Sequence, residues 1–273
     1  KQHYRGDFRT KEGGNGMSLI KNEFPILEYD TDERAVIMPD HDELEIHLPK
    51  KAVFAFLGDA IDQYAKACGA KIVGKFESVT KEYPIYVLKY KSEEICLVQA
   101  PLGAPAATQI LDWLISYGAT EIISGGSCGA LEEYEENVFL VPYRALRDEG
   151  TSYQYIKPFR YVTINPLARK AIEKTLQEHN LTYIEVTTWS TDGFFRETQE
   201  MVEYRKEEGC SVVEMECSAL AACAEMRGVV WGELLYTADS LACVEKYEER
   251  NWGNDSVEYA LKLCLDAVLN IKK

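Results

Sequence analysis

Runs of consecutive apolar residues alternate with helix-like segments from residue 52 to the end of the chain. The first run, Ala52 to Leu57, contains no polar residue, which is typical of a strand buried on both faces of a sheet. Segments with apolar residues at helical spacing follow such runs. One of them, Ala106 to Tyr117, is stopped by Gly118 in the manner of a helix C-terminus. No linker-like stretch interrupts the alternation, which predicts a single α/β domain.

Composition and charge narrow the classes of partner and compartment. The chain has 30 Lys and Arg against 45 Asp and Glu, a formal net charge of −15. This charge argues against nucleic acid or an anionic membrane surface as the main partner. The eight cysteines lack metal-ligand spacing, which favours reduced thiols and predicts no metal. No apolar run is long enough to span a bilayer, and residues 1–16 lack a signal-peptide core, so we expect a cytoplasmic protein.

The N-terminal part of the chain has a different character. Residues 1 to about 35 have the features of an irregular lead-in, with a flexible point at Gly13 to Gly16. We expect residues 1–40 to form a tail and lead-in, and residues 41–273 to form the functional domain. His41 lies between two acids just before the first predicted strand, a setting in which histidine is usually a solvated loop residue.

Two predicted loops carry groups that can contact a ligand. Gly125 to Gly129 follows the predicted strand Glu121 to Ser124 and forms a glycine-rich loop. Backbone N–H groups in such a loop can converge on an anion, although many strand–helix turns are glycine-rich for other reasons. The second loop, Arg147 to Tyr153, has a high density of polar and aromatic side chains.

Acidic residues stand at the ends of two predicted strands. Glu214 and Glu216 follow the β-branched pair Val212-Val213 and precede an alanine-rich, helix-like segment. Open α/β sheets bind ligands at such junctions. Ordinary solvated glutamates are also favoured at a helix start by the helix dipole, so the pair alone leaves both interpretations open. A second apolar run, Val229 to Tyr236, leads to Asp239, again an acid at a strand end.

These motifs resemble those of the nucleoside phosphorylases of the hexameric purine and uridine type and of the related nucleosidases. The similar segments are Gly58-Asp59, Pro101 to Pro105, Gly126 to Ala130, Arg147 to Tyr153, Asp192 to Phe195, and Val213 to Glu216. The resemblance covers most of the chain, from about residue 52 to the C-terminal helix. It implies a single-domain, three-layer α/β/α fold with a central mixed β-sheet.

The resemblance also implies a role for each matching residue. The catalytic residues would be Asp239, as the acid that protonates the departing base, and Arg250, as its partner. The ribose contacts would be Glu214, Met215, Glu216 and, across a dimer interface, His41. The base contacts would be Phe194, Phe195, Ser127, Cys128 and Gly129. The phosphate contacts would be Gly58, Lys81, Ser124 and Ser127. This set agrees with the chemistry, because N-glycosidic cleavage develops positive charge on the sugar and negative charge on the base.

The chain departs from the family pattern at the phosphate site. Family phosphorylases have an arginine where this chain has Ile61-Asp62, and another where it has Ser124. A phosphate dianion without charge-assisted contacts binds weakly. Either Arg144, Arg147 and Lys81 hold phosphate differently, or water is the nucleophile.

Three functional hypotheses follow. The first is a nucleoside phosphorylase that uses phosphate as co-substrate, without another cofactor, and yields free base and ribose 1-phosphate. The second is a phosphate-independent nucleosidase, and the third a non-catalytic nucleoside-binding protein. Asp239 favours purine nucleosides, whereas the Arg147 to Tyr153 loop resembles the uridine branch. Arg196, Thr198 and Gln199 lack the spacing of a uracil-reading site. The resemblance implies a homodimer or homohexamer with shared sites.

Overall fold

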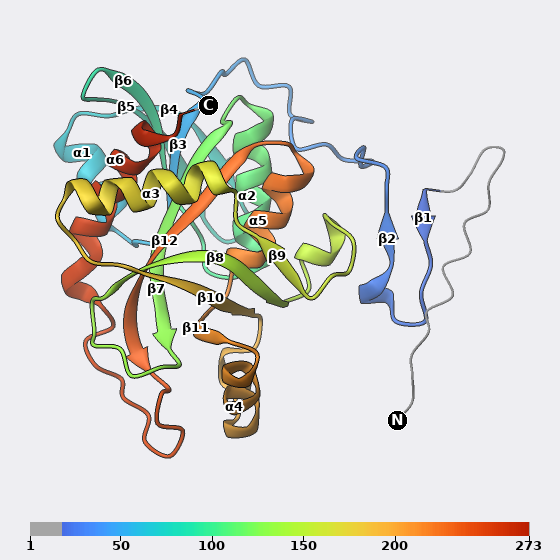
Figure 1. The fold of residues 1–273 in the computed structure, drawn as a ribbon. Coiled ribbons are helices and arrows are strands. Elements are labelled where there is room, and N and C mark those ends of the chain that lie inside the picture. Colours follow the sequence, from blue (N-terminus) through green and yellow to red (C-terminus); the bar gives the residue numbers. More distant parts are fainter. Residues whose placement is uncertain (1–17, 273) are drawn as a thin grey trace.

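The computed structural model describes residues 18–272. Its centre is a ten-stranded mixed sheet with helices on both faces (Figure 1). The strands of this sheet are β3 (Lys51–Ala55), β4 (Lys71–Glu77), β5 (Glu82–Tyr90), β6 (Glu93–Gln99), β7 (Glu121–Ala130), β8 (Phe139–Asp148), β9 (Tyr161–Thr163), β10 (Ile184–Thr191), β11 (Cys210–Glu214) and β12 (Val230–Ser240). The helices are α1 (Ala60–Ala67), α2 (Ala104–Ser116), α3 (Pro166–Glu178), α4 (Gln199–Glu207), α5 (Cys217–Met226) and α6 (Val257–Asn270). The predicted single α/β domain is confirmed.

The strand order is β11-β10-β8-β12-β7-β3-β6-β5-β4, and β9 pairs with β8. Strands β6, β3, β7 and β12 are parallel, whereas β8 runs antiparallel to β12. Strand β11 also pairs antiparallel with β7. This extra pairing closes β11, β10, β8, β12 and β7 into a ring, so one end of the sheet curls into a small barrel.

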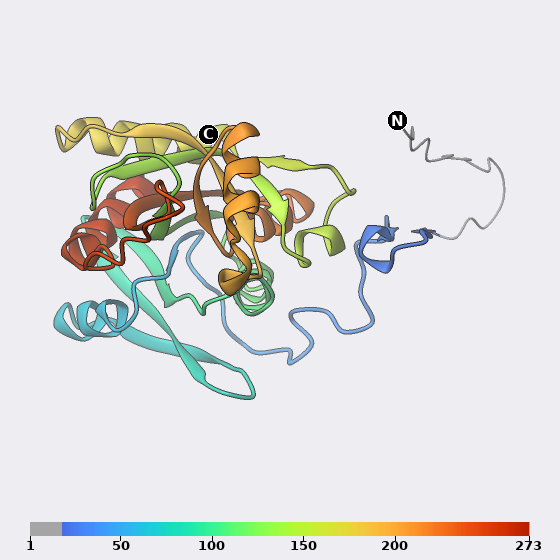
Figure 2. The same ribbon diagram turned by 90° about the horizontal axis from the view of Figure 1, so that it is seen from below.

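Two apolar layers hold the helices against the sheet. Side chains of α1, α3 and α6 form one layer with residues such as Val53 and Leu234. Side chains of α2 and α5 form the other with residues such as Phe54 and Trp231. Adjacent strand residues face opposite layers, so the uninterrupted apolar run around Phe54 is buried on both sides. Figure 2 shows the two helical layers from below.

Helix ends follow local sequence signals. The side chain of Asn165 caps α3 by accepting from the Leu167 N–H at 2.9 Å, and Pro166 occupies the first helical position. Gly118 ends α2 with a φ of 122°. A Cβ atom at Gly118 would lie 2.9 Å from the Leu48 carbonyl oxygen, so the position requires glycine.

The structure corrects the predicted bounds of two loops. The glycine-rich stretch Gly125 to Gly129 is the second half of β7, because β12 and β11 pair with it on both edges. Likewise β8 continues to Asp148, so the predicted loop from Arg147 begins within a strand. Strand pairing with distant segments overrides the turn-forming tendency of glycine here.

The lead-in lies apart from the sheet. Residues 18–40 contain a short two-stranded sheet of β1 (Leu19–Ile20) and β2 (Tyr29–Asp30), where an irregular segment was expected. In both views this arm extends away from the body of the molecule (Figures 1 and 2). The predicted flexible point at Gly13 to Gly16 lies outside the described residues. Within residues 18–272, no helix has both the length and the apolar character needed to cross a membrane.

Candidate active site

The closure of the barrel brings three acidic side chains to one region. Val213 of β11 pairs with Gly129 of β7, which places Glu214 and Glu216 beside the second half of β7. Ser240 of β12 pairs with Ala130 on the other edge of β7, which places Asp239 there as well. Glu214, Glu216 and Asp239 form the carboxyl cluster, and all three are buried, with 6–7% of each residue exposed. Buried carboxyls need specific partners, so the contacts of each one decide what it can do.

Glu214 is a positioning residue, because the protein occupies both of its oxygens. One oxygen accepts from the hydroxyls of Thr188, at 3.0 Å, and Ser190, at 2.5 Å. The other accepts from the backbone N–H groups of Glu216 and Cys217, both at 2.6 Å. These four donors leave no free position for ribose hydroxyls, so the expected ribose contact of Glu214 is wrong. Glu214 instead fixes the turn that begins α5.

Glu216 retains the capacity to bind a ligand. It is the residue before α5, and its carboxyl accepts the backbone N–H of Gly103 at 2.5 Å. Gly103 is itself the N-cap of α2, so the carboxyl also lies at the positive end of that helix. Burial and the charge of Glu214 raise the pKa of Glu216 to about 8. A buried carboxyl with unused acceptor positions suits two sugar hydroxyls. Met215 is partly exposed next to it.

Asp239 lies over Gly129. A Cβ atom at Gly129 would be 3.3 Å from the Asp239 Oδ1 and 3.0 Å from a Val213 methyl group, so any larger residue would require these neighbours to move by a few tenths of an ångström. Burial raises the pKa of Asp239, and a hydrogen bond from Tyr247 and the charge of Arg250 oppose this effect. A carboxyl that keeps its proton nearer neutral pH can act as a general acid.

Arg250 was expected to pair with Asp239, and the structure corrects this. Its guanidinium donates to the Tyr134 carbonyl at 2.8 Å and lies 3.7 Å from Glu248. It acts on Asp239 only through its charge. The group that most strongly opposes the raised pKa of Asp239 is Tyr247, which the sequence did not indicate, because an isolated tyrosine in a charged loop carries no motif.

The aromatic pair follows β10 and forms the turn η3 (Phe194–Arg196). The two rings meet edge to face with centroids 5.0 Å apart, and Phe194 is 42% exposed while Phe195 is 92% exposed. An exposed ring at this position can stack on a base. Glu197 comes next and is partly buried; burial and the charge of Asp239 raise its pKa to about 7. In the sequence, a glutamate two positions after Phe195 is the signal that identifies this residue.

Residues of β7 alternate between the site and the core. Ser127 is exposed, whereas the Cys128 side chain is buried against Leu140 and Val212. The Cys128 thiol donates to the Tyr236 carbonyl at 3.5 Å. The expected base contact of the Cys128 side chain is therefore wrong, because neighbouring strand residues face opposite sides. Ser127 and Gly129 remain candidates.

The expected phosphate contacts are only partly brought together. Gly58 forms an exposed turn with a φ of 54°, directly before α1. Ser124, in contrast, is fully buried, and its hydroxyl oxygen accepts from the Trp231 indole N–H at 3.0 Å, so it cannot hold phosphate. Lys81 donates to Gln99 at 2.7 Å. Asp62 accepts from the Tyr86 hydroxyl at 3.0 Å.

Both alternative arginines are held by the protein. Arg147 is buried and donates to the Ser152 hydroxyl and to the carbonyls of Ile156, Lys157 and Phe159. Burial lowers its pKa. Arg144 donates to Thr187 at 2.9 Å and stacks on Tyr161, with 4.5 Å to the ring centroid. The Arg147 guanidinium is therefore not a phosphate ligand in this arrangement, whereas Arg144 uses only its Nε–H in its hydrogen bond to Thr187.

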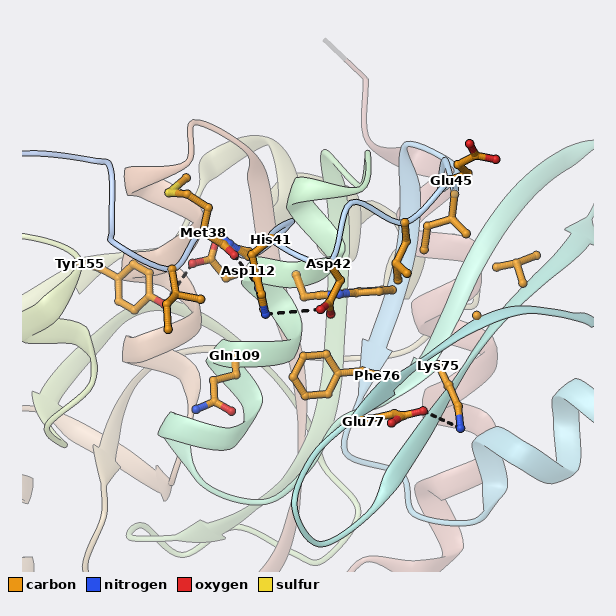
Figure 3. A pocket seen from close by; sticks show the side chains of 17 residues that line it. Met38, His41, Asp42, Glu45, Lys75, Phe76, Glu77, Gln109, Asp112 and Tyr155 are labelled. Carbon is orange, nitrogen blue, oxygen red and sulfur yellow. Dashed lines mark hydrogen bonds and ion pairs between the residues drawn. The ribbon is translucent and has the colours of Figure 1, made fainter.

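His41 lies away from the other expected ribose contacts. It lines a groove of about 840 Å³ between the lead-in, β4 and α2, which includes no residue of the carboxyl cluster (Figure 3). Its ring contacts the Met38 carbonyl at 2.9 Å and Asp42 at 3.5 Å. Within one chain it therefore does not join Glu216. Among the described residues, no group of three or more His, Cys, Asp or Glu side chains is arranged to hold a metal ion.

Comparison with known proteins identifies the family. The model of the phosphorylase superfamily matches residues 50–270. This chain belongs to the phosphorylase superfamily. The superfamily acts on nucleosides and includes phosphorylases and nucleosidases.

Three relatives illustrate the two chemistries. The guanosine phosphorylase of Halorubrum lacusprofundi is 24% identical over 217 residues, which cover 76% of this chain and 88% of that protein. The 5'-methylthioadenosine/S-adenosylhomocysteine nucleosidase of Buchnera aphidicola is 28% identical over 174 residues, 59% of this chain and 74% of that protein. The crystal structure of uridine phosphorylase from Vibrio fischeri superposes with a TM-score of 0.71 at 22% identity, covering 82% of this chain and 95% of that chain. The superposition confirms the fold expected for this superfamily.

Proposed function

We propose that this chain cleaves the N-glycosidic bond of purine nucleosides with water as the nucleophile. The proposal rests on the residues that stand where family phosphorylases have phosphate-binding arginines. Asp62 and the buried Ser124 stand where phosphorylases of the resembling family have arginines. Arg144 and Arg147 donate to protein acceptors instead. A phosphate dianion needs charge-assisted contacts, whereas water needs none.

The proposed chemistry uses three groups of the site. Glu216 accepts hydrogen bonds from the ribose hydroxyls, and Phe194 stacks on the base. Asp239 gives its proton to a ring nitrogen of the base while the bond between C1′ and the base nitrogen breaks, so the base leaves neutral. Water then adds to the cationic sugar and loses a proton, which yields ribose. We assign this activity to residues 41–273 and treat residues 1–40 as a lead-in.

The preference for purines rests on Asp239, because a carboxyl can protonate a purine ring nitrogen. The segment that would read uracil supports it as well. Gln199 begins α4, and its amide lies within 3.4 Å of Glu203 on the same helix. Thr198 precedes that helix as its N-cap. The Gln199 amide therefore already has a partner within its own helix.

The products distinguish the two reactions. We expect the enzyme to convert purine nucleosides to free base and ribose at the same rate with and without phosphate. Chromatography of the sugar product from a panel of nucleosides measures this. Ribose 1-phosphate formed only when phosphate is present would contradict hydrolysis. An absence of any product, together with tight nucleoside binding, would favour a non-catalytic binding protein.

Phosphorolysis is the second candidate function. The exposed Ser127 hydroxyl and the Gly58 turn leave partial anion contacts at the site. The similarity to a guanosine phosphorylase also favours it. In that case Lys81 from a neighbouring subunit would supply the missing positive charge.

We further propose a homodimer, or a trimer of dimers, with shared sites. His41 lies in a groove away from its own Glu216, so it can reach a ribose only in another subunit. Mixing and refolding a Glu216→Ala chain with a His41→Ala chain should therefore restore activity. If the two chains pair at random, half of the dimers contain one chain of each kind, and each of these mixed dimers has one intact site of its two. About one quarter of all sites, and so about one quarter of wild-type activity, should then be recovered. A fully active monomer by light scattering would exclude this arrangement.

A further inference from the structure

The loop that follows β8 is joined to the start of α5 by a buried hydrogen bond. Glu149 of this loop is 4% exposed, and its Oε1 accepts from the Ser218 hydroxyl at 2.7 Å. Ser218 is fully buried in the first turn of α5, two residues after Glu216. Breaking this bond would leave a buried carboxyl and a buried hydroxyl each without this partner, so the contact holds the loop and the helix together.

The loop is itself fixed, which gives Glu149 a defined position. The other oxygen of Glu149, Oε2, accepts the backbone N–H groups of Thr151 and Ser152, at 2.6 Å and 2.8 Å. The Ser152 hydroxyl oxygen accepts from the buried Arg147 guanidinium at 2.9 Å. The carboxyl of Glu149 therefore connects an anchored loop to α5.

The start of α5 is also held from β10. The Ser218 N–H donates to the Ser190 hydroxyl oxygen at 2.9 Å, and the Ser190 hydroxyl donates to Glu214 at 2.5 Å. Glu214 in turn accepts the Glu216 N–H at 2.6 Å. All four residues are buried. Ser218 is therefore the residue at which the loop and β10 together hold the turn that contains Glu216.

The position of this turn decides where the Glu216 carboxyl lies. Glu216 is the residue directly before α5, with a φ of −139° and a ψ of −29°, so the helix itself does not fix its backbone. A shift of the start of α5 would move the carboxyl relative to a bound sugar. A misplacement of about 1 Å in such a contact can lower the rate by about 10²-fold.

We propose that Glu149 is a positioning residue, which acts through Ser218 to hold Glu216 against the ribose hydroxyls. The inference rests on the proposed cleavage of purine nucleosides, and in particular on the ribose contact of Glu216. Glu149 itself does not touch the substrate in this arrangement. Its loss should therefore weaken the use of the sugar hydroxyls and leave proton donation by Asp239 unchanged.

The test compares kcat/KM for adenosine with kcat/KM for 2′,3′-dideoxyadenosine, which lacks both ribose hydroxyls. Ser218→Ala removes the hydroxyl that joins the loop to α5 and keeps the N–H that donates to Ser190. This variant should lower kcat/KM about tenfold or more for adenosine and less than about threefold for the dideoxy analogue. A general loss of folded protein would lower both values by the same factor and leave their ratio unchanged.

Variants of Glu149 show whether it acts through Ser218. Glu149→Ala should lower the ratio by the same factor as Ser218→Ala. The double variant should lower it no further, because both changes break one connection. Glu149→Gln should keep the ratio near that of the wild type, because the amide can accept a backbone N–H and donate to the Ser218 hydroxyl oxygen.

Ser256→Ala is the matched control. Ser256 is also a buried serine at the start of a helix, because it is the N-cap of α6, and its hydroxyl donates to the Asn137 side chain at 2.8 Å. It lies outside the carboxyl cluster and the loop that contains Glu149. Its replacement should leave the ratio of the two kcat/KM values unchanged.

The outcomes separate this inference from the proposed function. If the wild type prefers adenosine and Ser218→Ala leaves the ratio unchanged, the role of Glu149 is wrong and the proposed function stands. If the wild type cleaves neither nucleoside, the proposed function fails. The dissociation constants of both nucleosides, measured by calorimetry, then test the inference, and an unchanged ratio in Ser218→Ala overturns it. If either Glu149→Ala or Ser218→Ala does not fold, the ratio of the other variant decides.

Discussion

Asp239→Asn should lower kcat for purine nucleoside cleavage by about 10²–10⁴-fold, which is the usual contribution of a general acid. Asparagine keeps the size and the hydrogen-bonding capacity of the side chain but has no acidic proton. Because burial raises the pKa of Asp239, wild-type activity should fall on the alkaline side as this carboxyl ionises. The pH–rate profile of the variant should lack this decrease at alkaline pH. Steady-state kinetics from pH 5 to 9 would measure both effects.

Two controls make this prediction specific. A nucleoside with an activated leaving group needs little proton donation, so the variant should cleave it at close to the wild-type rate. Asp255→Asn changes an exposed aspartate outside the carboxyl cluster and should leave all rates unchanged. If Asp239→Asn cleaves inosine and adenosine as fast as the wild type, Asp239 is not the acid and base departure needs another proton source.

Glu216→Gln should weaken activity and at the same time stabilise the protein at alkaline pH. Replacement of the carboxyl removes acceptor positions for the ribose hydroxyls, so kcat/KM should fall at least about tenfold. The amide oxygen can still accept the Gly103 N–H, which preserves the local turn. A variant with near wild-type kcat/KM would remove Glu216 from the sugar site.

The stability effect follows from the pKa of about 8. In the unfolded chain Glu216 ionises near its ordinary value of 4.5, whereas in the folded chain it keeps its proton up to about pH 8. Its contribution to stability is therefore complete below about pH 4.5 and is lost as the pH rises to about 8, a change of a few kcal/mol. Glutamine has no charge to bury, so the Tm of the variant should fall less between pH 5 and 8. Parallel Tm curves for both proteins over this range would contradict the assignment.

The chain order of strands and helices could be predicted because it depends on local apolar patterns. The run around Phe54 and the helical spacing before Gly118 each identify an element without knowledge of its partners. The positions of Glu216 and Asp239 at strand ends could be predicted for the same reason. The resemblance that these motifs carry also predicted the fold, which the superposition on uridine phosphorylase confirms.

The tertiary structure alone decided which of the polar candidates are available to a ligand. Glu214 and Glu216 look equivalent in the sequence, yet Thr188 and Ser190 of β10 occupy the first and leave the second free. In the sequence Arg147 was a candidate phosphate ligand, but in the structure its guanidinium donates to backbone carbonyls of the loop that follows it. The Glu214 contacts depend on the pairing of β11 with β10, which sets Glu214 opposite Ser190, and the Arg147 contacts depend on how the loop after β8 folds back over that side chain. Local sequence patterns carry no information on such pairings, because the side that a strand residue faces depends on its register with distant strands.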